Sequence, residues 1–204
     1  MAADVLVLCY HALSPSWDAA LSTTPERFER QLALLHGRGY RGATFTEAAL
    51  GRVQGRVVAV TFDDAYRSVL ELARPILDRL GMPATVFAPT KFVGGGAPLA
   101  WAGVERWLGG DHQRELTPMS WAELRSLVAA GWEVGSHTCT HPPLTTLEDS
   151  ALVDELERSK AECEQGMGAD CTSLAYPYGD VDARVVAACA RAGYRAAAAL
   201  PELW

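Results

Sequence analysis

The sequence lacks any long hydrophobic run. Of its 204 residues 49% are hydrophobic, yet no segment approaches the run of about 18 apolar residues that a membrane-spanning helix needs. We therefore expect no membrane insertion. The N-terminal run from Val5 to Tyr10 has no basic flank and no cleavage site, so it is not typical of a signal peptide. The chain is expected to be cytoplasmic as written, and extracellular or periplasmic if an N-terminal extension has been lost.

Paired cysteines and basic runs are also missing. The five cysteines show no spacing typical of a zinc knuckle or a disulfide framework, so reduced thiols are expected. The formal net charge is −7, from 18 Lys and Arg against 25 Asp and Glu. Nucleic acid and anionic membrane surfaces are therefore poor candidate partners. A neutral or weakly charged substrate fits this balance better.

Short β-rich runs alternate with longer helical ones along the chain, which is long enough for one core and short for two. Alternation of this kind predicts parallel strands covered by helices, in an open sheet or a closed barrel. An irregular, glycine-rich segment over 89–117 interrupts it. A single domain is predicted over 1–204. That domain is either complete at residue 204 or lacks a C-terminal closing segment. The predicted strands cover 5–10, 57–62, 84–87, 132–134, 174–176 and 194–200, and the predicted helices cover 25–37, 69–80, 120–131, 148–164 and 183–192.

Polar residues gather just beyond the C-terminal ends of the predicted strands. His11 follows the first strand, Asp63 and Asp64 follow the strand that ends at Phe62, and His137 comes after a later one. A polar turn over 177–180 follows another. In parallel α/β folds active sites are built at this edge of the sheet. The sequence therefore predicts a site where these segments converge.

His137 and His141 have a spacing that can bring two imidazoles to one cation. Zinc favours nitrogen ligands with a carboxylate, and Asp63 or Asp64 is available to complete the set. One acid would bind the cation and the other would take a proton from its water. Without a metal, the histidines are ordinary loop residues and the acids cap the following helix. Two adjacent carboxylates after an uncharged strand, however, exceed what capping needs.

Three ordered motifs carry a family resemblance. They are Thr61-Phe62-Asp63-Asp64, His137-Thr138-Cys139-Thr140-His141 and Tyr176-Pro177-Tyr178-Gly179. Together they resemble the motifs of the polysaccharide deacetylases, the NodB-homology domain of carbohydrate esterase family 4. The resemblance covers nearly the whole chain and implies an α/β fold, a distorted (β/α) barrel of about seven parallel strands.

The resemblance also implies roles for individual residues. Asp64, His137 and His141 would hold one divalent metal ion, zinc in most of the family and other divalent cations in some members. Asp63 would be the catalytic base. Tyr178 is similar to the residue whose backbone N–H helps to form the oxyanion hole.

The chain departs from the family pattern in two places. Family members usually carry a late histidine as general acid, whereas no histidine follows His141 here. One branch of the family has a Tyr-His pair at the end of its first strand and uses that histidine as the acid, and Tyr10 with His11 matches this branch. Ala175 stands where an arginine often leads the third motif. The sequence therefore does not identify the group that orients Asp63.

The function predicted from these observations is metal-dependent hydrolysis of acetyl groups from N-acetylated sugars by a metal-activated water. The substrate would be a polysaccharide, an oligosaccharide or a glycan precursor. A second hypothesis keeps the metal and changes the bond, to an O-acetyl ester or to a cyclic amide or imide. A third is a catalytically inactive carbohydrate-binding homologue.

Overall fold

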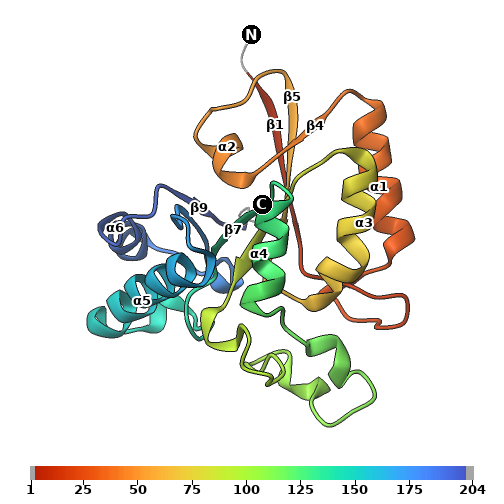
Figure 1. The fold of residues 1–204 in the computed structure, drawn as a ribbon. Helices are drawn as coiled ribbons and strands as arrows, with labels where there is room; N and C mark the ends of the chain where they lie inside the picture. Colours follow the sequence, from red (N-terminus) through yellow and green to blue (C-terminus); the bar gives the residue numbers. More distant parts are fainter. Residues whose placement is uncertain (1–2, 201–204) are drawn as a thin grey trace.

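A parallel sheet forms the centre of the molecule in the computed structural model, which describes residues 3–200 (Figure 1). Its strand order is β1-β5-β6-β7-β8-β9, and β4 pairs with the first half of β5. Every pairing in this sheet is parallel, as the alternating pattern predicted. The strands are β1 (Asp4–Tyr10), β4 (Arg41–Ala43), β5 (Arg56–Phe62), β6 (Thr85–Ala88), β7 (Glu133–Ser136), β8 (Ser173–Ala175) and β9 (Ala196–Ala198), and a separate small pair joins β2 (Ala12–Leu13) to β3 (Ser22–Thr23).

Helices cover the sheet in two groups. In Figure 1, α1 and α3 lie together beside β1 and β5, whereas α5 and α6 lie together near β9. Among the described helices, none combines the length and the apolar content that a membrane crossing requires. The α-helices are α1 (Pro25–Gly37), α2 (Phe45–Ala49), α3 (Arg74–Leu80), α4 (Trp121–Ala129), α5 (Asp149–Met167) and α6 (Ala183–Arg191). A π-helical stretch, η1 (Val69–Ala73), leads into α3, and the 3₁₀ turns are η2 (Thr90–Phe92), η3 (Glu105–Trp107), η4 (Gln113–Leu116), η5 (Leu144–Thr146) and η6 (Pro177–Gly179).

Strand composition explains where the core lies. β5 carries no charge after Arg56 and is buried along the rest of its length, as expected for a strand covered on both faces. β1 instead alternates between exposed and half-buried residues along most of its length. Its half-buried Tyr10 packs edge-on against Phe28 of α1, with ring centroids 5.0 Å apart. Val7 and Cys9, on the other face of β1, line a cavity. The face of β1 that carries Val7 and Cys9 is therefore accessible to a ligand.

The sheet curls into a half-barrel and does not close. Within residues 3–200, β1 pairs only with β5 and β9 pairs only with β8, so the two edge strands are not joined. The expected α/β fold with a distorted barrel is therefore confirmed in its curled, open form. The sequence pattern alone had left the open and the closed sheet equally possible.

Most predicted elements are present with small shifts at their ends. The strand expected over 194–200 is shorter, because only Ala196–Ala198 pair with β8. The segment 89–117 is irregular as predicted, with short 3₁₀ turns inside it. The prediction missed β4 and α2, over 41–49, which are too short to show a periodic hydrophobic pattern. It also missed the pair of β2 and β3.

Gly135 allows β7 to pack closely against its neighbours. A Cβ atom added there would lie 2.6 Å from Ser173 Oγ and 2.7 Å from the ring of Phe87. Both distances are shorter than van der Waals contact, and both neighbours belong to adjacent strands of the buried sheet. Packing therefore favours glycine at position 135, two residues before His137.

We predict that Gly135→Ala lowers the free energy of unfolding by about 1–3 kcal/mol, because the new methyl group overpacks the core. Chemical denaturation monitored by circular dichroism measures the change. Gly37→Ala is the matched control, since a Cβ at the end of α1 meets nothing within 4 Å. That variant should be neutral or slightly stabilising. Equal effects of the two substitutions would contradict the packing argument.

Candidate active site

Segments that are distant in the sequence meet at the carboxyl edge of the sheet. His11 follows β1, Asp63 and Asp64 follow β5, His137 follows β7 and Tyr178 follows β8. They line one cavity of about 520 Å³, and His141 lines it too. The structure therefore brings together every residue that the sequence singled out for the site. Residues from both edge strands, among them Val7 and Ala198, also line this cavity.

Asp64, His137 and His141 converge on one point. The Asp64 Oδ1 atom lies 3.3 Å from Nε2 of His141 and 3.5 Å from Nε2 of His137. A tetrahedral zinc ion with bonds of roughly 2.0–2.1 Å separates its ligand atoms by about 3.3 Å. The Asp64 Oδ1 atom is buried and has no hydrogen-bond partner among the described residues. Donor types, spacing and the unpaired oxygen all fit a divalent cation.

Each imidazole is held by different contacts. Nδ1 of His137 lies 2.8 Å from the carbonyl oxygen of Ala175. A carbonyl only accepts, so Nδ1 carries the proton and Nε2 presents its lone pair toward Asp64. His141 is held by packing: its ring stacks on Trp101 with centroids 4.2 Å apart, and the edge of Tyr178 approaches to 4.7 Å.

Burial keeps this cluster close to neutral in the absence of a cation. It raises the pKa of Asp64 well above its ordinary value, and the neighbouring Asp63 raises it further. Burial lowers the pKa of His137 to about 3 and that of His141 to about 2. Neutral imidazoles are the form that binds metals. A divalent cation would supply the positive charge that ionised Asp64 lacks here.

The loop that carries the two histidines is strained and is tied to α5. Thr138 and His141 have φ angles of 66° and 62°, a left-handed region that few non-glycine residues adopt. Glu155, only 8% exposed, accepts hydrogen bonds from the backbone N–H groups of Cys139 and Thr140 at 2.8 and 2.9 Å, and from the Thr140 hydroxyl at 2.7 Å. Thr138 Oγ1 accepts from the His141 N–H at 3.0 Å. These bonds hold the loop in shape.

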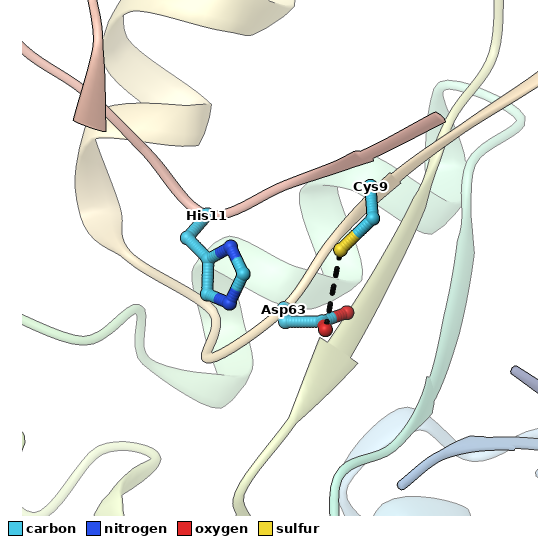
Figure 2. Close-up of side chains that lie close together, drawn as sticks. All are labelled: Cys9, His11 and Asp63. Carbon is cyan, nitrogen blue, oxygen red and sulfur yellow. Dashed lines mark hydrogen bonds between the residues drawn. The ribbon is translucent and has the colours of Figure 1, made fainter. Parts of the chain in front are cut away.

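Asp63 lies beside β1, next to Cys9 and His11 (Figure 2). Its N–H donates to the carbonyl oxygen of Tyr10 at 2.9 Å, which continues the β1–β5 ladder beyond Phe62. The Cys9 thiol donates to Asp63 Oδ2 at 3.5 Å. Burial raises the pKa of Asp63 to about 7, partly offset by the hydrogen bond from Cys9. The Cys9 thiol thus contacts Asp63, the carboxylate whose orienting group the sequence did not identify.

His11 and Tyr178 complete the wall of the cavity. Burial lowers the pKa of His11 to about 4, so its ring is neutral at neutral pH. Tyr178 has a φ of 60° in the turn after β8, and its hydroxyl donates to the carbonyl of Ala102 at 3.3 Å. The oxyanion role of the Tyr178 N–H stays a prediction.

The sequence did not reveal several contacts of this site. Glu155 belongs to a helix with many charged residues, and nothing local marks it as the buried one. Trp101 stacks on His141 from within the irregular segment, a contact that only the tertiary structure reveals. Cys9 had a weak signal, because it lies two residues before His11 and therefore on the same side of an extended chain.

Residues 51–197 match the polysaccharide deacetylase family. The chain belongs to this family. The matched range contains all three motifs and excludes His11, so the expected branch with the N-terminal Tyr-His pair stays a prediction.

Two curated relatives show how much of a known protein this polysaccharide deacetylase family member covers. The chain is 27% identical over 198 residues to YxkH of Bacillus subtilis, covering 95% of this chain and 63% of that protein. It is 25% identical over 171 residues to the poly-β-1,6-N-acetyl-D-glucosamine N-deacetylase of Staphylococcus aureus, covering 78% and 54%. The chain therefore spans less than two thirds of the length of either relative.

A solved structure supports the same assignment. The crystal structure of a polysaccharide deacetylase from Bacillus cereus superimposes with a TM-score of 0.76 at 26% identity, over 96% of this chain and 57% of that one. The open half-barrel is therefore a fold that this family uses.

We predict that Glu155→Ala weakens metal binding by roughly 10–100-fold, because the histidine loop loses the acceptor of three hydrogen bonds. Isothermal titration with Zn²⁺ measures the affinity. Glu157→Ala is the matched control, since this exposed residue lies in the same helix. Unchanged affinity in a folded Glu155→Ala variant would show that the loop keeps its shape without the carboxylate.

Proposed function

We propose that this chain is a metal-dependent deacetylase that removes acetyl groups from N-acetylated sugars. The observation that carries the proposal is the convergence of Asp64, His137 and His141 in a cavity that also contains Asp63. The name of the Staphylococcus aureus relative supports a polymer of N-acetylglucosamine as the substrate.

Asp64, His137 and His141 would hold the cation. When bound, a divalent cation supplies Lewis acidity, which polarises a carbonyl oxygen and lowers the pKa of water. The rings of Trp101 and Tyr178 pack against His141 and limit the water around this point. The protein thereby keeps the electrostatic effect of the cation strong.

Asp63 would act as the base. Its carboxylate lines the same cavity, and burial brings its pKa to about 7, near the value that suits a proton acceptor at neutral pH. It takes the proton of the attacking water. The backbone N–H of Tyr178 donates a hydrogen bond to the acetyl oxygen as negative charge develops there.

His11 would return a proton to the departing amine. Because burial favours the neutral ring, the resting enzyme does not hold His11 as an imidazolium, and the ring must be protonated during turnover. Asp63 can supply this proton after removing it from water, since a carboxylate oxygen of Asp63 and a ring nitrogen of His11 lie within 4.8 Å of each other. One bridging water spans such a distance.

We predict that His137→Ala removes both the activity and the cation held by Asp64, His137 and His141. The purified wild-type protein should contain about one Zn²⁺ per chain and release acetate from poly-β-1,6-N-acetylglucosamine or a chitin oligomer, whereas the variant should lose both. His36→Ala, at an exposed position in α1, is the control. Metal without acetate release would redirect the assignment to another acyl substrate or to a binding module. Absence of metal after zinc addition would remove the basis of the proposal.

Asp63→Asn should retain the metal and lose roughly 10²–10⁴-fold in kcat, because an amide cannot accept the proton of the attacking water. Acetate release and metal content, measured on the same preparation, check the two parts. Asp111→Asn, at an exposed position of the irregular segment, should leave both unchanged. Full activity of Asp63→Asn would make the assignment of the base wrong.

A further inference from the structure

Cys9, His11 and Asp63 form a second group of potential ligands beside the first (Figure 2). One sulfur, one nitrogen and one oxygen atom from these residues all lie within 4.8 Å of one another. Cys9 and His11 stand two residues apart on one face of the chain at the end of β1. The β1–β5 register then sets Asp63 next to both.

We propose that Cys9, His11 and Asp63 bind a second divalent cation, one with affinity for thiolates such as Zn²⁺, Co²⁺ or Cd²⁺. The Cys9 Sγ and Asp63 Oδ2 atoms are 3.5 Å apart. A tetrahedral zinc ion with a Zn–S bond of about 2.3 Å and a Zn–O bond of about 2.1 Å separates these two ligands by roughly 3.6 Å. The spacing of Cys9 and Asp63 therefore needs little change to accept the ion, and the His11 ring, whose nitrogen lies within 4.8 Å of both, supplies the third ligand.

The donor set selects the class of cation. A thiolate with an imidazole and a carboxylate suits borderline and soft metals, whereas Mg²⁺ and Ca²⁺ prefer oxygen ligands alone. On binding, the S–H bond of Cys9 breaks, a sulfur–metal bond forms and the proton passes to solvent. The Cys9 thiolate and the Asp63 carboxylate then balance the charge of the divalent cation.

The second site shares no ligand with the first. Asp64 faces His137 and His141, whereas Asp63 contacts Cys9. All of these residues line the same cavity, so both positions are reached from solvent. Among the described cysteines, Cys9 is the exposed one.

Occupancy of this site has a functional consequence, which rests on the proposed function. The second cation would occupy Asp63 and His11, the groups assigned to proton transfer. Excess Zn²⁺ or Cd²⁺ should therefore inhibit the enzyme after the first cation has activated it.

Cobalt titration of the metal-free protein tests the site without relying on activity. The wild type should bind about two Co²⁺ per chain and develop the charge-transfer absorption of a cobalt–thiolate bond. Cys9→Ser should lose that band and weaken one binding event at least about tenfold. His137→Ala should keep the band and lose the other event. Cys189→Ser, which alters a buried thiol of α6, is the control and should behave as the wild type.

Saturation of the wild type at about one Co²⁺ without a thiolate band would overturn the proposal. So would a band that survives in Cys9→Ser. If that variant does not fold, the wild type gives a second measurement: bound Cd²⁺ should slow alkylation of Cys9 at least about tenfold, and an unchanged rate overturns the proposal. Acetate assays separate the two ideas, because a protein that binds both cations and releases no acetate contradicts the proposed function alone.

Discussion

A buried carboxylate without a partner is the constraint on which the site depends. Asp64 is 2% exposed, and its Oδ1 atom faces two imidazoles that burial keeps neutral. An ionised carboxylate in such a place is costly unless positive charge compensates it. The folded chain does not provide that charge nearby, since no described lysine or arginine forms an ion pair with Asp64. The buried triad of Asp64, His137 and His141 is thus consistent with a site for a divalent cation.

The rest of the structure holds this arrangement in place. Asp64 itself has a φ of 69°, and the histidine loop contains further left-handed residues. The compensating contacts come from distant elements: Glu155 of α5 ties the loop, and the carbonyl of Ala175 in β8 fixes the ring of His137. Strain at the ligands is therefore balanced by hydrogen bonds further out, which is how ligand geometry is usually preorganised.

The open sheet gives the buried ligands a route to solvent. A small closed barrel fills its interior with side chains. Here the unpaired edges of β1 and β9 both contribute to the cavity wall, through Val7 and Ala198. The same opening leaves Cys9 and His11 beside Asp63 in contact with the cavity. A substrate can therefore reach the candidate metal ligands and the groups proposed for proton transfer through one cavity.

The sequence by itself determined the parallel α/β order, most element positions and the edge at which the site forms, because these follow from hydrophobic periodicity, capping residues and strand ends. It also singled out Asp63, Asp64, His137 and His141 as candidate site residues, since their types and spacing are local properties. Only the tertiary structure decided that Asp64 faces the imidazoles while Asp63 faces Cys9, and that Glu155 is buried under the loop. Those facts depend on strand register and on burial by residues far apart in the chain, neither of which local sequence encodes.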